Sequence, residues 1–301
     1  MEEQPKLATA QMNLVRPKAP VTGTIVANDL CTKGKSASFV RHTVIDVSGT
    51  PLAGQFRAGQ SFGVLPPGTD EDGKPHKVRL YSIACPTWGE DGEGLHLSTT
   101  PKRVIDEFKP QNAQHDVHDH SLFLGVCSNY LCDLREGDPV LLTGPQGKRF
   151  LLPESTGEHD YLFLATGTGI APFRGMIMEL LTGANGPTKR RIDLVMGTPY
   201  TTDLLYDELF VELAAQHPNF RYHTAISREA DPLYVAGVLQ RQIDDFAPLL
   251  SKPSTLIYVC GLAGMELGLF DVLDEHGLAD GYLRAVGKQR KTTGRCMLEV
   301  Y

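Results

Sequence analysis

The chain of 301 residues has the composition of a globular protein, with 41% hydrophobic and 22% charged residues and a formal net charge of −7. This negative balance does not favour bulk binding to nucleic acid or to a membrane surface. No apolar run reaches the roughly 18 residues that a transmembrane helix needs, so we expect no membrane span. The first twenty residues lack the apolar centre of a secretory signal, which makes a cytoplasmic location the default expectation.

The first half of the chain reads as a series of short strands. Between residues 20 and 153, apolar runs such as VTGTIVAND, SFVRHTVID, VRLYSIAC and DPVLLTGP alternate with Gly and Pro turns. This spacing predicts a closed antiparallel barrel or a sandwich. TDEDGKPHK and KPQNAQHDVHDH read as polar loops. His115, His118 and His120 in the second loop could bind a metal, but no Cys accompanies them and no helix fixes their spacing, so we expect no metal site.

From about His159 the pattern changes to strand-like runs that alternate with helix-length segments. The strand-like runs are DYLFLAT, RIDLVMG, FRYHTAIS, TLIYVCG and RCMLEVY. This alternation predicts a parallel sheet covered on both faces, with ligands bound beyond the carboxyl ends of its strands. We therefore expect an antiparallel barrel domain at 1–154, with 1–17 as a flexible tail, and an α/β domain at 155–301.

The six cysteines are expected to be free thiols, because a cytosolic chain of this size rarely forms disulfides. Cys127 and Cys132 have the C-x4-C spacing that opens a plant-type iron–sulfur signature. The C-x2-C continuation is missing because position 135 is an arginine. The sequence therefore predicts neither an iron–sulfur cluster nor a zinc site.

Three short motifs are candidates for cofactor binding. ATGTGIAP (165–172) follows an apolar run and opens a helix-length segment, so its free amides favour a phosphate, although a plain strand–helix turn is the alternative. Arg228 follows a strand and is a candidate for the ribose 2′-phosphate of NADP, or else an ordinary surface residue. Arg79 and Tyr81 share one face of a strand and could bind the phosphate and the ring of a flavin, although aromatic residues also fill strands for packing.

Taken together and in this order, the motifs resemble the plant-type ferredoxin–NADP+ reductase family from about residue 18 to the last residue. The blocks that carry the resemblance are RLYSIAC (79–85), GVCSNYLCDL (125–134), GPQGKRFLLP (144–153), ATGTGIAPFRGM (165–176), GTPYTTDLLYDELF (197–210), AISRE (225–229), YVCGLAGME (258–266) and LEVY (298–301). The resemblance implies a FAD-binding barrel and an NADP-binding α/β domain. It also implies electron exchange between NADP(H), by hydride transfer at flavin N5, and a one-electron carrier such as ferredoxin or flavodoxin.

The resemblance also implies roles for single residues. Arg79 would bind the FAD diphosphate, Tyr81 would stack on one face of the flavin, and Ser82 would hydrogen-bond near N5. Tyr301 would cover the other face and would have to move aside for the nicotinamide. The flavin would further be held, mainly through backbone groups, by Val126, Cys127 and Ser128.

For NADP(H), the resemblance assigns Thr168 and Gly169 to the nicotinamide end and the diphosphate. Ser227 and Arg228 would bind the 2′-phosphate and Tyr234 would stack on the adenine. The nicotinamide pocket would be lined by Cys260 and Glu299, and Gly261 is also assigned to cofactor binding. The implied catalytic set, which would tune geometry and proton supply, is Ser82, Cys260, Glu299 and Tyr301.

Two positions depart from the family pattern. No basic residue precedes Tyr234 within 230–233, which puts a strict preference for NADP over NAD in question. The aromatic residue that follows the Lys-Arg pair in the family, where it stacks on the FAD adenine, is also missing. Ile105 and Asp106 occupy that region, so we expect the adenine to be held either differently or loosely.

Basic side chains are candidates for docking an acidic carrier protein, with solvated surface as the alternative. They are Lys35, Lys77, Lys288, Arg290 and Lys291, and Lys102 and Arg103 face either the cofactor or the partner. Two other functions remain open: the reductase component of a multi-component oxygenase, and a flavin-binding module without turnover. The intact set of Tyr81, Ser82, Cys260, Glu299 and Tyr301 argues against the second of these.

Overall fold

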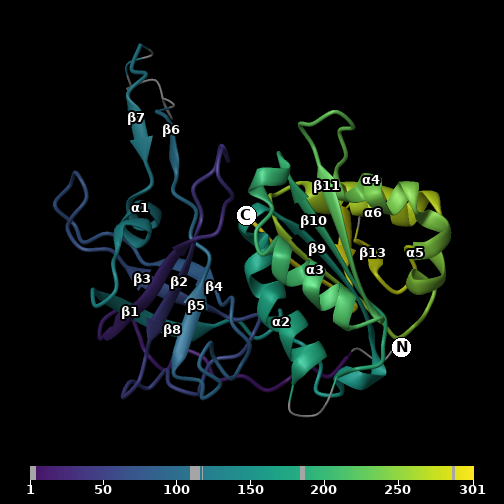
Figure 1. Cartoon of the computed structure of the whole chain (residues 1–301), viewed down its shortest axis with the longest axis horizontal. Coiled ribbons are helices and arrows are strands. Elements are labelled where there is room, and N and C mark those ends of the chain that lie inside the picture. Colours follow the sequence, from purple (N-terminus) through teal and green to yellow (C-terminus); the bar gives the residue numbers. More distant parts are fainter. Residues whose placement is uncertain (1–4, 109–115, 117, 184–186, 287–288) are drawn as a thin grey trace.

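The computed structural model describes most of the chain: residues 5–108, 116, 118–183, 187–286 and 289–301. Its main strands form one antiparallel and one parallel sheet, which lie side by side (Figure 1). The antiparallel sheet ends at Gln146 and the parallel sheet begins at Asp160. The expected domain boundary at 154/155 falls between them and stays a prediction. Within the described part of the chain, no helix is both long and apolar enough to cross a membrane.

The antiparallel sheet has six strands in the order β4-β3-β8-β1-β2-β5. Its strands are β1 (Val21–Leu30), β2 (Arg41–Asp46), β3 (Ser61–Leu65), β4 (Arg79–Ser82), β5 (His96–Thr99) and β8 (Pro139–Gln146). The edges meet where the backbone N–H of Ala84 donates to the carbonyl of Ser98 at 2.9 Å and the Thr99 hydroxyl donates to the carbonyl of Ser82 at 2.8 Å. Because the edges are joined, the sheet closes into the predicted barrel.

The parallel sheet has five strands in the order β11-β10-β9-β12-β15. Its strands are β9 (Asp160–Thr166), β10 (Ile192–Thr198), β11 (Phe220–Ile226), β12 (Thr255–Gly261) and β15 (Cys296–Val300). They match the five strand-like runs of the sequence, which confirms the predicted fold class. The chain order reverses between β9 and β12, and ligands of such sheets bind beyond the carboxyl ends of the strands at this point.

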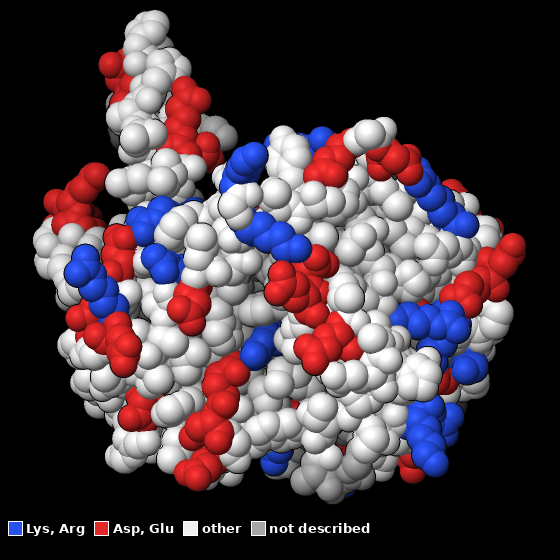
Figure 2. All heavy atoms as spheres, in the orientation of Figure 1, with Lys and Arg blue, Asp and Glu red and all other residues white. Residues whose placement is uncertain are grey.

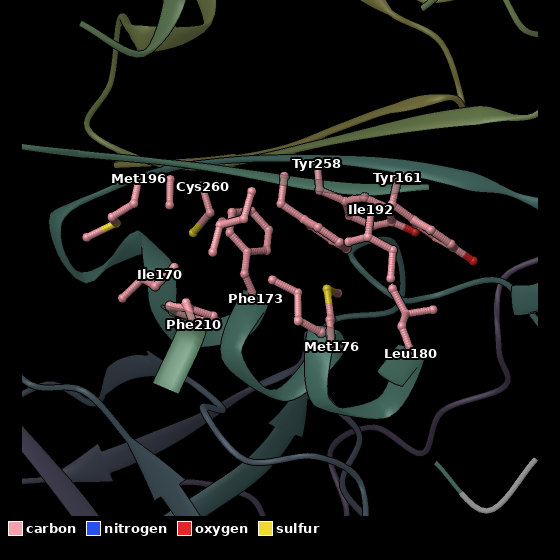
Figure 3. Packing of buried hydrophobic residues seen from close by; sticks show 14 of the residues in the cluster. Tyr161, Ile170, Phe173, Met176, Leu180, Ile192, Met196, Phe210, Tyr258 and Cys260 are labelled. Carbon is pink, nitrogen blue, oxygen red and sulfur yellow. The ribbon is translucent and has the colours of Figure 1, made fainter. Parts of the chain in front are cut away.

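Helices cover both faces of the parallel sheet. One face carries α2 (Ile170–Thr182) and α3 (Asp207–Gln216), and the other carries α4 (Val235–Arg241), α5 (Ile243–Leu250) and α6 (Met265–Glu275). Ile170, Phe173, Met176 and Leu180 recur at helical spacing, so they form one apolar stripe on α2. Figure 3 shows these side chains pointing at the sheet, where they meet buried residues of β9, β10 and β12.

The same helix α2 also contacts the barrel. A Cβ atom on Gly175 would lie 2.2 Å from the carbonyl oxygen of Cys85, so the absence of a side chain allows this close approach. Arg174 donates hydrogen bonds to the carboxylate of Glu90 at 2.6 Å and to the carbonyl of Ala84 at 3.0 Å. The stripe on α2 therefore packs on the sheet while its other side is held by the barrel.

Glu90 belongs to a half-buried polar cluster at this junction. His42 Nε2 lies 3.3 Å from its carboxylate, and His42 Nδ1 lies 2.9 Å from the hydroxyl of Tyr206. Burial alone would raise the pKa of Glu90, but the hydrogen bond from His42 and the charge of Arg174 outweigh burial and lower this pKa to about 2. Glu90 and Arg174 are therefore a charged pair held between the two domains.

The amino-terminal segment differs from the expected flexible tail at 1–17. The backbone N–H of Ala8 donates to the carbonyl of Leu152, and the N–H of Val15 donates to the carbonyl of Gly144, both at 2.9 Å. Val15 is buried in the barrel core. The described part of this segment is thus held by backbone pairing and by a buried apolar side chain, even though its composition is polar.

Several short elements have no counterpart in the sequence expectations. They are β6 (Ile105–Glu107), β7 (Leu122–Leu124), α1 (Val126–Asp133), β13 (Leu283–Val286) and β14 (Gln289–Thr292). Strands of three or four residues are too short to show an alternating pattern. The segment YVAGVLQRQIDDF also forms two helices, because Gln242 between α4 and α5 has a non-helical backbone conformation.

Candidate active site

A cleft of about 860 Å³ lies between the barrel and the carboxyl edge of the parallel sheet, a volume typical of cofactor and ligand pockets. On the barrel side it is lined by Arg79, Tyr81, Ser82, Val126, Cys127 and Ser128. On the other side it is lined by Thr168, Glu299 and Tyr301. The fold therefore brings together predicted site residues from both halves of the chain.

Strand β4 supplies a cation and an aromatic ring to the cleft. Arg79 and Tyr81 alternate along the strand, so both side chains project from the same face. Arg79 is exposed, and no other described residue pairs with its guanidinium. Burial, together with the nearby Cys127, raises the pKa of Tyr81, so its phenol stays protonated at neutral pH. An unpaired cation next to a neutral ring suits a ligand with both phosphate and an aromatic system.

Helix α1 begins at the cleft with its first turn uncapped. Its N-cap residue, Gly125, offers no side-chain hydrogen bond to the free backbone amides of this turn. The Cys127 thiol points into the barrel, where Sγ lies 3.9 Å from the carbonyl oxygen of Val64, and the Ser128 hydroxyl donates to the Gly125 carbonyl at 3.3 Å. This segment therefore offers mainly backbone N–H groups to an anion.

Two glycines bring the ends of β9 and β12 into close contact. A Cβ atom on Gly169 would lie 2.2 Å from the carbonyl oxygen of Cys260. Gly261 has a φ of +137°, and a Cβ atom there would lie 2.2 Å from Oγ1 of Thr166. Thr166 in turn accepts a hydrogen bond from the backbone N–H of Leu262 at 2.8 Å. These contacts fix the two turns where the chain order of the sheet reverses.

Cys260 and Glu299 are direct partners in the register of β12 and β15. Cys260 is buried beneath the start of α2 and is not among the residues that line the cleft (Figure 3). Burial raises its pKa, and the charge of Glu299 adds to this, so the thiol stays protonated. Glu299 does line the cleft, and burial raises its pKa to about 7. Its carboxyl group is thus poised to gain or lose a proton near neutral pH.

Tyr301 closes one side of the cleft. Its backbone N–H donates to the carbonyl of Gly261 at 2.9 Å, and its carbonyl oxygen accepts from the N–H of Ala263 at 3.0 Å. The ring is 65% exposed, and its hydroxyl lies 2.9 Å from the hydroxyl of Thr168. The backbone is therefore fixed, whereas the ring is held at its tip by one hydrogen bond.

Ser227, Arg228 and Tyr234 lie at the same edge of the sheet but outside this cleft. The backbone N–H groups of Ser227 and Arg228 donate to the carbonyls of Thr198 and Pro199 at 3.0 and 2.9 Å. The Arg228 side chain is exposed and, among the described residues, has no ion-pair partner. Tyr234 is 72% exposed at the start of α4. This edge thus presents a free cation and a free ring to solvent.

Some expectations for the site differ from the structure. Cys260, Gly169 and Gly261 support the wall of the cleft from behind and do not line it. Phe123 lines the cleft although the sequence did not point to it, because its hairpin was not predicted. Lys102 lines the cleft as expected, whereas Arg103 forms an ion pair with Asp133.

The cysteines and the histidine loop add no further site. All six cysteines are free, as the sequence predicts. His120 hydrogen-bonds to the carboxylate of Glu107, and His115 lies outside the described residues. No group of three or more His, Cys, Asp or Glu side chains in the described ranges is arranged to hold a metal ion.

Comparisons with known proteins agree with this arrangement. The oxidoreductase NAD-binding domain family matches residues 163–269. The cyanelle ferredoxin–NADP reductase of Cyanophora paradoxa is 36% identical over 96% of this chain and 79% of its own length. The chloroplastic leaf isozyme 1 of ferredoxin–NADP reductase from Arabidopsis thaliana is 34% identical over the same shares. The solved ferredoxin–NADP+ reductase of Plasmodium falciparum aligns over 96% of this chain and 99% of its own, with a TM-score of 0.74 and 23% identity.

The chain combines a closed barrel, in which an unpaired Arg79 lies beside Tyr81, with a parallel sheet of the nucleotide-binding type. This combination defines the class of two-domain oxidoreductases that use a flavin together with a pyridine nucleotide. The cleft between the domains is where the two ligands of that class meet. Within this class, the identity to the Cyanophora and Arabidopsis proteins over nearly the whole chain decides the family. The chain belongs to the plant-type ferredoxin–NADP+ reductase family.

Proposed function

We propose that this chain is a FAD-dependent reductase that exchanges electrons between NADP(H) and ferredoxin. The observation that carries the proposal is the cleft in which Arg79 and Tyr81 of the barrel face Glu299 and Tyr301 of the parallel-sheet domain. Family membership adds support, because the curated relatives carry the name ferredoxin–NADP reductase. Flavodoxin as a second carrier stays a prediction, and so does the cytoplasmic location.

The barrel wall of the cleft fits FAD. Arg79 supplies an unpaired guanidinium for the diphosphate, and the first turn of α1 supplies backbone N–H groups to the same anion. Tyr81 and Tyr301 supply rings for the two faces of the flavin, with Ser82 beside Tyr81 on β4.

The carboxyl edge of the parallel sheet fits NADP(H). Arg228 and Ser227 would bind the 2′-phosphate, and Tyr234 would stack on the adenine, because Arg228 and Tyr234 are exposed beyond β11 and Ser227 is half-buried beside Arg228. Thr168 and the turn at Gly169 would receive the diphosphate and nicotinamide end. A structure of the Plasmodium falciparum enzyme with 2′P-AMP shows that a protein of this fold takes a 2′-phosphorylated nucleotide.

The chemistry that FAD supplies when bound is the exchange of a hydride, which carries two electrons, for single electrons. Glu299 holds the proton that must be stored or released near the reacting ring, since its pKa lies at about 7. Tyr301 excludes water from its side of the cleft and would make room by breaking its hydrogen bond to Thr168. Cys260 would act from behind the wall, as packing beneath the nicotinamide pocket.

Ferredoxin would dock on exposed basic side chains. Lys35, Lys77 and Lys291 are exposed, whereas Arg290 forms an ion pair with Asp274 and Lys288 lies outside the described residues. Figure 2 shows Lys and Arg interspersed with Asp and Glu on one face of the molecule, without a single-sign field. Docking by a few separated cations would make association depend on ionic strength.

The decisive experiment combines flavin content with nucleotide kinetics. The purified full chain should be yellow with FAD and should reduce ferredoxin with NADPH, at a rate that falls as salt is added. Arg228→Ala should raise the KM for NADPH by roughly 10- to 100-fold, because a charge-assisted contact is worth about 1.5–3 kcal/mol, and should leave the KM for NADH unchanged. Arg135→Ala, which removes an exposed arginine from the barrel, is the matched control.

Three results would contradict the proposal at different levels. A folded chain that takes up no FAD would exclude the flavoenzyme itself. An equal rise in the KM for NADPH and in the KM for NADH in Arg228→Ala would exclude only the role of Arg228 at the 2′-phosphate. A rate with ferredoxin that does not respond to ionic strength would exclude the docking residues.

A further inference from the structure

The hairpin of β6 and β7 projects from the body of the barrel (Figure 1). Phe123 of β7 lines the cleft together with Val104, which precedes β6. The Phe123 side chain is 49% exposed, although a large ring normally gains from burial. A half-exposed aromatic ring at the rim of a ligand cleft is suited to stacking on a flat ligand group.

The register of the hairpin shows which face the ring occupies. Phe123 is directly opposite Asp106, and directly opposed residues share a face of the ladder. Leu122 and Leu124 alternate with Phe123, so they project from the other face, and neither lines the cleft. The sequence has Ile105 and Asp106 where an aromatic residue was expected after the Lys-Arg pair. The structure places a ring across the ladder from that position.

The wall of the cleft is continuous from β4 to this hairpin. Val64 pairs with Arg79 in the register of β3 and β4, and the Cys127 thiol at the start of α1 contacts the carbonyl of Val64. The backbone N–H of Gly125 then donates to the carbonyl of Val104 at 3.0 Å, which joins α1 to the base of the hairpin. A dinucleotide with its diphosphate at Arg79 therefore has the hairpin within reach of its second half.

We infer that Phe123 is the stacking platform for the adenine of FAD. Phe123 lies on the second strand of the hairpin and takes the role that an aromatic residue on the first strand would have. This inference rests on the proposed function, because it needs FAD in the cleft. The apolar face of the ring supplies dispersion and stacking to the purine without any base-specific hydrogen bond. The ring thus sets how tightly the chain discriminates FAD from FMN, which has the same flavin and no adenylate.

The test measures dissociation constants of FAD and FMN for the flavin-free full chain by fluorescence titration. Phe123→Ala should weaken FAD by roughly tenfold or more, since base–aromatic stacking commonly contributes that much, and should leave FMN unchanged. Phe123→Trp should retain the wild-type preference for FAD. Leu122→Ala is the matched control, because Leu122 is 73% exposed on the same strand and faces away from the cleft.

The outcomes separate this inference from the proposed function. If the wild-type chain binds FAD and Phe123→Ala binds it equally well, the adenine platform is excluded while the flavoenzyme stands. If Phe123→Ala weakens FAD and FMN by the same factor, the ring supports the fold of the flavin site and the inference is overturned. A wild-type chain that binds neither flavin overturns both.

Discussion

At the scale of single residues, Glu299 has the most unusual environment in the cleft. It is a carboxylic acid that lines a ligand cleft, and no described side chain pairs with it. Burial therefore acts alone and raises its pKa from 4.5 to about 7. The neutral acid is the form that the folded chain favours, so ionisation at higher pH opposes folding.

Replacing Glu299 with glutamine should remove this pH dependence. The raised pKa means that the stabilising effect of the neutral acid is fully present below pH 4.5 and is lost as the pH rises through about 7. Between pH 5 and pH 8.5, the free energy of unfolding of Glu299→Gln should therefore rise relative to that of the wild type by roughly 2–3 kcal/mol, as measured by urea unfolding. Glu71→Gln, in an exposed loop, should show no such gain. Parallel pH profiles for Glu299→Gln and the wild type would contradict the assignment.

At the scale of elements, the turn from β9 into α2 has its shape because the end of β12 is in direct contact with it. Gly169 and Gly261 are each in contact with the neighbouring turn, and a side chain at either position would displace backbone. The turn therefore has its shape from two strands that are far apart in the sequence. The ability of the turn to bind a phosphate therefore depends on that packing as much as on the residues of the turn.

Gly169→Ala should both destabilise the chain and weaken NADPH binding. Its Cβ would lie 2.2 Å from the carbonyl oxygen of Cys260, so the start of α2 must shift, at a cost of about 1–3 kcal/mol. Gly157→Ala is the control, since Gly157 also lies in a short 3₁₀ turn and a Cβ there meets no atom within 4 Å. We expect thermal unfolding and the KM for NADPH to change in the first variant and to stay near wild type in the second. Wild-type behaviour of Gly169→Ala would show that the turn is not tightly constrained.

Long elements could be predicted from sequence and short ones could not. DYLFLAT and TLIYVCG are continuous apolar runs between turn residues, so their strands follow from local pattern alone. The three-residue strands of the β6–β7 hairpin carry no such pattern, and the place of Phe123 depends on their pairing. The family resemblance places Cys260 in the nicotinamide pocket, although a thiol at the end of a strand is usually a small buried apolar residue. Which side of the sheet it faces was set by the packing of α2, which no local pattern reveals.

At the scale of the whole molecule, the largely solvent-shielded pair of Glu90 and Arg174 joins the two domains. Arg174→Met should cost about 3 kcal/mol, because it removes the charge partner of the Glu90 carboxylate, which keeps only its contacts with His42 and Ser98. The double variant Glu90→Leu/Arg174→Met should recover much of that loss, since neither charge remains. Urea unfolding measures both effects. Arg241→Met, which breaks an exposed pair with Asp231, should cost less than about 1 kcal/mol. Equal losses in the free energy of unfolding for Arg174→Met and Arg241→Met would show that the Glu90–Arg174 pair contributes no more than an exposed pair.

The position of α2 has a consequence for how the chain takes up its ligands. One side of this helix belongs to the core of the parallel sheet, and Gly175 on its other side touches the barrel backbone. The separation between the two walls is thus set before any ligand arrives, and association carries little entropic penalty for ordering large parts of the chain. The Tyr301 backbone is fixed and its ring is held by one hydrogen bond, so we expect the ring to move aside by a change of rotamer, which is far faster than a rearrangement of domains.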